Sequence, residues 1–196
     1  MAFTLQIGDS CPDFSLPGVD GKTWSRDDFR DAAVLVVAFT CNHCPYVINS
    51  EERIITYAAD YKDRAGGGVR LVCINANETD NHPTDDFEHM QQRAREKGFN
   101  FPYLRGETQE IARAFGALKT PHFFLFDRER KLRYTGRMDD SPREPRGATT
   151  KELRDATEAV LRGEAPRVPL TNPIGCNIKW KGKPEKWMPP EACDLV

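Results

Sequence analysis

Three stretches of the chain are dominated by apolar residues, and longer segments with helical spacing lie between and after them. Residues 32–39 form an unbroken apolar run rich in valine, and residues 69–74 form a second apolar stretch. Such short runs are typical of strands that are covered on both faces of a sheet. Residues 121–127 and 131–137 are joined by a charged turn and predict a hairpin of two further strands.

Apolar residues at helical spacing predict four helices. The first begins near Pro45, because proline is tolerated in a first helical turn, and ends before the glycines at 66–68. The second has Thr84 as its N-cap and ends at Gly98, and a short third helix covers residues 111–118. A capping box precedes the last helix, formed by Thr149 and Glu152.

The order of these elements is β-α-β-α-α-β-β-α, which predicts an α/β fold, a three-layer α/β/α sandwich with a mixed central sheet. Residues 1 to about 30 are rich in turn signals and lead into the domain. Beyond Gly163 the chain is rich in proline and lysine but keeps four apolar anchors, so we expect a tail packed on the domain. These anchors are Ile174, Ile178, Trp180 and Trp187. We therefore divide the chain into a domain at residues 1–163 and a C-terminal extension at residues 164–196.

Composition and charge exclude several functional classes. The 196 residues are 39% hydrophobic and 30% charged, with a formal net charge of −2, so nothing indicates binding to nucleic acid or to an anionic membrane. No apolar run approaches the ~20 residues that a membrane helix needs. The first residues have neither the basic start nor the apolar core of a signal peptide, so we expect a cytoplasmic location.

A cytoplasmic location changes how the six cysteines are interpreted. In a reducing compartment a close pair of cysteines is catalytic, redox-sensing or metal-binding more often than structural. Cys41 and Cys44 form such a pair, separated by two residues at the junction between the strand at 32–39 and the following helix.

The position of Cys41 and Cys44 suits thiol–disulfide exchange. A cysteine just before a helix lies near unpaired N–H groups, which favour the thiolate, the form that attacks a disulfide. We expect Cys41 to attack and Cys44, on the same helical face, to resolve the mixed disulfide. A protonated His43 would stabilise the thiolate further and make the couple more oxidising.

The strand–CxxC–helix arrangement, with Thr120-Pro121 opening a later strand, resembles the thioredoxin superfamily. The segment GDSCPDFSLPGVDGK is similar to the opening of its redoxin branch, and CNHCPYV and IGCNIKWK resemble a peroxiredoxin-like thioredoxin subgroup. The resemblance implies that Pro121 is a cis-proline beside the active-site cysteines and that Thr120 and Pro121 contact the substrate. It also implies disulfide-containing proteins or small disulfides as substrates, a cellular dithiol as electron donor, and no bound cofactor.

Two departures from the family pattern leave alternatives open. Thioredoxins place a buried aspartate in the strand before the pair, whereas residues 32–39 are apolar here. Peroxiredoxins carry P-x-x-x-T-x-x-C, but Thr40 lies one position too far from Cys44 and position 36 is valine. The alternative to disulfide exchange is a thiol peroxidase in which Cys44 is oxidised and Cys41 or Cys176 resolves it.

A second alternative is a redox-sensing or metal-binding module without turnover. Cys176 and Cys193 could supply two more zinc ligands, but they are too far apart in sequence to form a second C-x-x-C, so we expect no metal. Cys176 follows a turn and is a candidate third redox thiol. Cys11 and Cys73 are expected to be structural.

Overall fold

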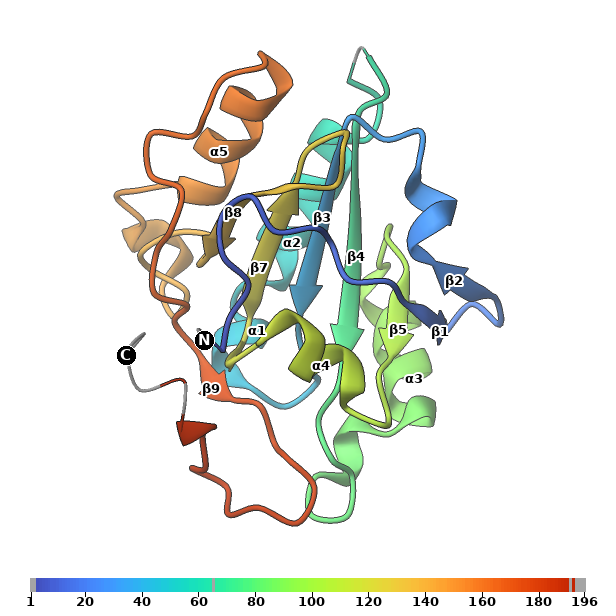
Figure 1. Ribbon diagram of the computed structural model, residues 1–196. Helices are drawn as coiled ribbons and strands as arrows, with labels where there is room; N and C mark the ends of the chain where they lie inside the picture. The colour runs from blue at the N-terminus through green and yellow to red at the C-terminus, as the bar shows by residue number, and fades with distance from the viewer. Residues whose placement is uncertain (1–2, 65, 191, 193–196) are drawn as a thin grey trace.

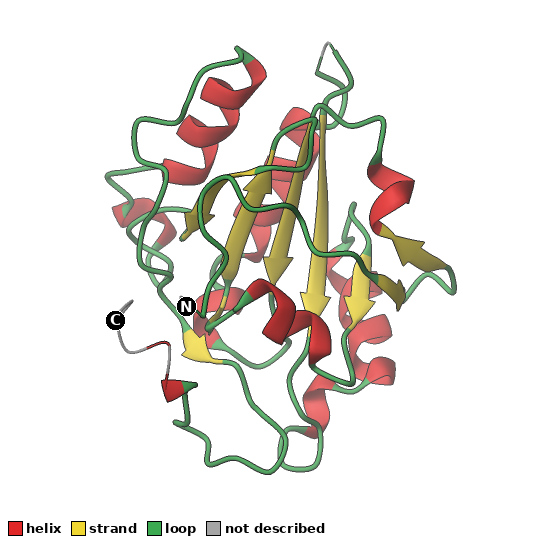
Figure 2. Ribbon diagram, viewed as in Figure 1, coloured by secondary structure: helices red, strands yellow, loops and turns green. Residues whose placement is uncertain are grey.

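A computed structural model describes residues 3–64, 66–190 and 192 of the chain. A five-stranded sheet in the order β5-β4-β3-β7-β8 forms its centre (Figures 1 and 2). The strands are β3 (Val34–Phe39), β4 (Val69–Asn75), β5 (Tyr103–Arg105), β7 (His122–Phe126) and β8 (Leu132–Gly136). β3, β4 and β5 are parallel, whereas β7 runs antiparallel to β3 and β8 antiparallel to β7. The mixed sheet and the predicted hairpin are therefore confirmed.

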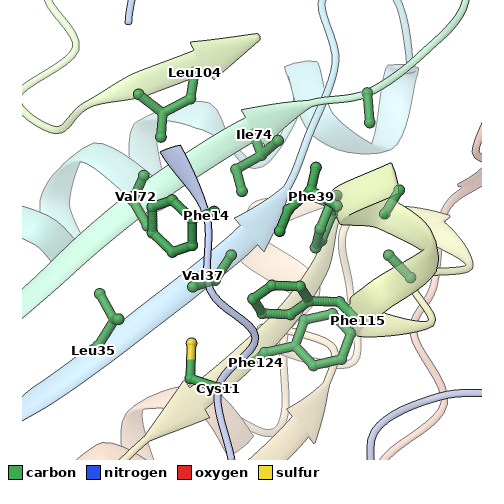
Figure 3. Packing of buried hydrophobic residues seen from close by; sticks show 14 of the residues in the cluster. Cys11, Phe14, Leu35, Val37, Phe39, Val72, Ile74, Leu104, Phe115 and Phe124 are labelled. Carbon is green, nitrogen blue, oxygen red and sulfur yellow. The ribbon is translucent and has the colours of Figure 1, made fainter. Parts of the chain in front are cut away.

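The two faces of the sheet carry separate cores because side chains alternate along each strand. On one face, Val34, Val36 and Ala38 pack beneath α2 (Glu51–Tyr61), α3 (Phe87–Lys97) and α5 (Glu152–Leu161). On the other face, Leu35, Val37 and Phe39 lie beneath α4 (Glu110–Phe115), the N-terminal segment and part of the C-terminal tail (Figure 3). This arrangement is the predicted three-layer α/β/α sandwich.

The helices follow the predicted pattern, with corrections at their ends. α1 (Pro45–Ile48) begins at the expected proline, but the helix is interrupted and α2 follows from Glu51. Thr84 does not cap α3, because it lies in a short 3₁₀ helix (Pro83–Asp85), and Asp86 caps α3 by accepting the His89 N–H. Gly98 ends α3 in a left-handed conformation, as predicted.

The capping box predicted for α5 is also wrong. Lys151 occupies the N-cap position. Thr149 bonds the Asp140 carboxylate instead, and the neighbouring Thr150 hydroxyl donates to the Glu152 side chain.

Two segments outside the central sheet pack against it. The N-terminal segment forms a small hairpin of β1 (Ser15–Pro17) and β2 (Thr23–Ser25), followed by a 3₁₀ helix (Arg26–Phe29). The C-terminal tail crosses the end of the sheet, where β9 (Cys176–Asn177) pairs with β6 (Lys119–Thr120). In the tail, Ile178 and Trp180 are buried in the core cluster, while the division of the chain at Gly163 stays a prediction. In the part of the chain that the structure describes, no helix is long and apolar enough to cross a membrane.

Candidate active site

The two cysteines of the C-x-x-C motif lie in the connection between β3 and α1, at the carboxyl end of the parallel strands. Cys44 is the N-cap residue of α1 (Pro45–Ile48), and Cys41 lies before the helix in the loop that leads into it. Both are buried, at 2% exposure for Cys41 and 0% for Cys44, and they form a small cluster with Val47. The expectation that both cysteines lie on one helical face is wrong, because the helix begins only at Pro45. The turn formed by residues 41–44 nevertheless keeps their thiols in contact.

Thr120, in β6, contacts the sulfur atoms of both Cys41 and Cys44. Its hydroxyl lies 3.3 Å from the Cys41 Sγ, and its carbonyl accepts a hydrogen bond of 3.2 Å from the Cys44 thiol. The peptide bond between Thr120 and Pro121 is cis, as the resemblance implied. The two sequence motifs that the resemblance connects, C-x-x-C and Thr-Pro, therefore meet at one place.

A third cysteine reaches the pair from the C-terminal tail. In the antiparallel pairing of β6 with β9, Cys176 lies directly opposite Thr120. Its side chain packs on the cluster of Cys41 and Cys44, and both its thiol and its backbone N–H point to the Cys44 sulfur. Figure 1 shows β9 beside α1 at the end of the sheet where β3 and β4 finish. The structure thus brings the three candidate redox thiols together.

The surroundings of the three thiols give them opposite acidities. Hydrogen bonds from the Cys41 thiol, the Cys176 thiol and the backbone N–H groups of Cys176 and Val47 lower the pKa of Cys44 to about 5, although burial opposes them. Burial raises the pKa of Cys41 well above its ordinary value, and burial raises that of Cys176 to about 12. Of the three thiols, Cys44 therefore has the surroundings that most favour the thiolate, because ionisation costs it one bond to the Thr120 carbonyl but strengthens the bonds from several donors.

A buried carboxylate lies beside the motif, from a part of the chain that sequence reasoning did not select. Asp85 is fully buried and accepts four hydrogen bonds, which hold it ionised and its pKa low despite burial. The donors are the backbone N–H of Asn42 at 2.6 Å, the His43 Nδ1 at 2.7 Å, and the side-chain amides of Asn75 and Asn77 at 3.1 and 2.8 Å. Asp85 thereby fixes the backbone and one ring of the C-x-x-C motif.

His43 lies between this carboxylate and a second histidine. The hydrogen bond to Asp85 raises the pKa of His43 above its ordinary value, although burial opposes this. The His43 ring stacks on the His82 ring at 5.0 Å, and the His82 Nδ1 is 2.5 Å from the Glu78 carboxylate. The structure thus places an imidazole with a raised pKa next to Cys41.

The donors of this region were tested as a metal site. Cys41, His43 and Asp85 place one ligand atom each within 4.8 Å of one another. However, both Asp85 oxygens already accept two hydrogen bonds each, so binding a metal would break a satisfied network. Of the two further zinc ligands considered from the sequence, Cys176 contacts Cys44, whereas Cys193 lies outside the described residues.

With this geometry in view, comparison with known families is decisive. A model of the AhpC/TSA family matches residues 7–135 of the chain. This chain belongs to the AhpC/TSA family. The match covers β1 through most of β8 and so includes the C-x-x-C motif and Pro121, but not β9 with Cys176.

A curated protein and a solved structure are similar to this chain over much of its length. A protein of Mycobacterium tuberculosis named "Putative peroxiredoxin Rv2521" is 28% identical over 117 residues, which are 58% of this chain and 65% of that protein. The chain thus spans about two thirds of the length of the curated relatives it matches. A hypothetical protein of Sinorhizobium meliloti 1021 has a crystal structure with a TM-score of 0.85 and 38% identity, over 93% of this chain and 98% of that one.

A more distant likeness establishes the fold. The thioredoxin domain of a thiol-disulfide oxidoreductase from Bacteroides vulgatus superimposes with a TM-score of 0.53 at 16% identity, over 66% of this chain and 86% of that domain. The fold of this AhpC/TSA family member is therefore thioredoxin-like, as the sequence resemblance implied.

The remaining described cysteines lie apart from the site. Cys11 packs among the aromatic and aliphatic side chains of the core (Figure 3), and burial raises its pKa to about 12. Cys73 is buried within β4, and burial raises its pKa as well. All five described cysteines, these two included, are free thiols.

Proposed function

We propose that this protein is a thiol–disulfide oxidoreductase that cycles Cys41 and Cys44 between a dithiol and a disulfide. The observation that carries the proposal is the pairing of a low-pKa Cys44 with a neutral, buried Cys41 against the same threonine. Membership of a redox family supports it. Reactive cysteines combine a stabilised thiolate with a partner thiol that completes the exchange.

The proposed reaction follows from these two acidities. The Cys44 thiolate attacks one sulfur of a substrate disulfide, which forms a mixed disulfide and releases the other sulfur as a thiolate. That thiolate takes the proton of Cys41, and the Cys41 sulfur then attacks Cys44. The Cys41–Cys44 disulfide forms, the second substrate thiolate leaves, and two electrons have passed to the substrate. An external dithiol returns the pair to the reduced state.

This order of attack differs from the one expected from the sequence. Cys41 was expected to be the nucleophile because it precedes a helix, but the donors in the structure converge on Cys44. Thr120 then positions the two sulfurs, with Pro121 beside it across the cis peptide bond, and His43, when protonated, adds positive charge from the side. Substrates of this class are disulfide-containing proteins or small disulfides.

Trapping with oxidised glutathione tests the proposal. The reduced protein should form the Cys41–Cys44 disulfide, whereas Cys41→Ser combined with Cys176→Ser should accumulate glutathione on Cys44, as read by peptide mass spectrometry. Cys44→Ser should not trap glutathione, and Cys11→Ala, a matched change at a core thiol, should behave as the wild type. Unimpaired exchange in Cys44→Ser would overturn the proposed order of attack.

A second function is supported by the contact between Cys44 and Cys176. As a thiol peroxidase, the Cys44 thiolate would attack a hydroperoxide, giving a sulfenic acid and an alcohol or water. The Cys176 thiol would then condense with the sulfenic acid, releasing water and forming a Cys44–Cys176 disulfide. Brief treatment with substoichiometric peroxide distinguishes the two functions. Only the peroxidase predicts that peroxide forms a Cys44–Cys176 disulfide faster than oxidised glutathione forms the Cys41–Cys44 disulfide.

A further inference from the structure

The backbone of β6 is the edge along which an extended chain can reach the active-site sulfurs. Thr120 contacts Cys41 through its hydroxyl and Cys44 through its carbonyl. A polypeptide that pairs with this edge therefore places a side chain over Cys44, and strand addition of this kind is a common way to bind an extended peptide.

The tail of the same chain already occupies this edge. β9 pairs antiparallel with β6, with Cys176 opposite Thr120 and Asn177 opposite Lys119. The Ile178 N–H donates to the Leu118 carbonyl at 3.1 Å. Cys176 directs its thiol at Cys44, in the place where a substrate strand would present its own sulfur.

The tail lies so close to the edge that a glycine is required. A Cβ at Gly175 would lie 2.1 Å from the Thr120 carbonyl oxygen and 3.1 Å from the Pro121 nitrogen. Real Cβ atoms do not approach backbone so closely, so any other residue at this position must push the tail away from β6. No second strand can fit between them.

The tail is fastened on both sides of this contact. Upstream, the Thr171 N–H donates to the Thr135 carbonyl at 3.0 Å. Downstream, Gln109 accepts from the Lys181 N–H and donates to the Lys179 carbonyl, at 2.8 and 2.7 Å. The burial of Ile178 and Trp180 in the core adds apolar anchoring.

We propose that residues 172–177 form a strap that fills the peptide-binding edge and restricts the site to small disulfides. A protein disulfide needs a strand-sized path to Cys44, and that path is taken, whereas a low-molecular-weight disulfide needs only local opening around the partly exposed Cys176. This inference rests on the proposed function and specifies its substrate class. It follows that weakening the strap admits protein disulfides.

The test compares two substrates in three proteins. Exchange rates with oxidised glutathione and with insulin, a protein disulfide, are measured for wild type, Gly175→Ala and Lys181→Ala. The last is a matched control in the same tail, since the Lys181 side chain is exposed and its bond to Gln109 comes from the backbone N–H, which alanine keeps. We expect the insulin-to-glutathione rate ratio to rise about tenfold in Gly175→Ala, which corresponds to about 1.4 kcal/mol of lost pairing, and to stay unchanged in Lys181→Ala.

A second variant guards against a folding defect in Gly175→Ala. Lys119→Met removes the 2.6 Å bond between the Lys119 Nζ and the Asn177 side chain, so it should shift the same ratio in the same direction by a smaller factor. The strap would be overturned if the insulin-to-glutathione rate ratio of wild type equalled that of Gly175→Ala.

An assay independent of disulfide exchange separates the strap from the proposed function. Cys44 is labelled either with iodoacetamide or with a maleimide that carries a polyethylene-glycol chain, and the labelled peptide is identified by mass. We expect the bulky reagent to label Cys44 only in Gly175→Ala. If the bulky reagent labels Cys44 in wild type as readily as in Gly175→Ala, the strap is contradicted. If wild type still excludes the bulky reagent but shows no disulfide exchange, only the proposed oxidoreductase function is contradicted.

Discussion

The cysteines of the core and Cys44 at the end of the sheet are equally buried but differ in acidity. Cys11 and Cys73 are 2% and 1% exposed, and Cys41 and Cys44 are 2% and 0% exposed. Burial raises the pKa of both core thiols, whereas donors that converge on Cys44 lower its pKa to about 5. Burial alone therefore does not determine the pKa of these thiols. What differs is the number of N–H and S–H groups directed at the sulfur.

The largest predicted difference between Cys44 and the core cysteines is in the rate of disulfide exchange. Cys44→Ser should reduce exchange with oxidised glutathione by about 10³-fold or more, because the attacking thiolate is removed. Cys11→Ala should change the rate by less than about twofold, since Cys11 lies in the core. Stopped-flow or discontinuous assays of glutathione release measure both. Comparable losses in the two variants would mean that the site is no different from the core.

The second prediction concerns Asp85, the buried carboxylate that bonds the C-x-x-C motif. Asp85→Asn should lower the free energy of unfolding by about 3 kcal/mol, because a buried carboxylate with four donors loses its charge. Asp86→Asn is the matched control, since asparagine caps a helix as well as aspartate, and it should cost under about 0.5 kcal/mol. Urea unfolding measures both.

The pH dependence of that loss has a defined sign. The pKa of Asp85 is lowered from 3.8, so its contribution is present above that pH and is lost as the pH falls. The pKa of His43 is raised from 6.5, so its contribution is present below that pH and is lost as the pH rises through the folded value. The difference between wild type and Asp85→Asn should therefore be largest between pH 3.8 and 6.5. A difference that stays the same when the pH is taken well below 3.8 and well above 6.5 would exclude the ion pair.

The sequence predicts the parts of this site that belong to recognisable motifs, but not a residue such as Asp85 that only the tertiary structure brings to them. The order of the predicted strands and helices was sufficient to predict the fold class, and the resemblance that C-x-x-C and Thr120-Pro121 carry implied the meeting of the two motifs. Asp85 was not selected, because it stands beside Asp86 in a charged stretch, and only the tertiary structure buries Asp85 fully while it leaves Asp86 half-buried. The short strand β5 was missed for a similar reason, since three residues carry too little periodicity to predict a strand.

The third prediction removes a core thiol. Cys73→Ala should lower the free energy of unfolding by about 1 kcal/mol, because a small cavity forms in β4, and should leave glutathione exchange unchanged. Denaturant titration and the exchange assay on the same preparation test both parts. A loss of exchange without a loss of stability would assign Cys73 to the site instead of the core.

The smallest predicted effect concerns the charge on His43. His43→Asn keeps a donor to Asp85 but removes the positive charge near Cys44, so the thiolate should become less stable. Exchange should slow by about two- to fivefold near the pKa of Cys44 and not at all at alkaline pH, where Cys44 is ionised in both proteins. A loss that is equal at every pH would indicate a structural role instead.

The central claim is that Cys44 is a thiolate at neutral pH, and the ultraviolet absorbance of the thiolate tests it most directly. In the reduced protein, titration should remove one thiolate as the pH falls through about 5, and the step should be absent in Cys44→Ser but retained in Cys11→Ala. If no thiolate is detected until the pH approaches 9.0, the ordinary value for cysteine, then Cys44 resembles the core thiols and the account is contradicted.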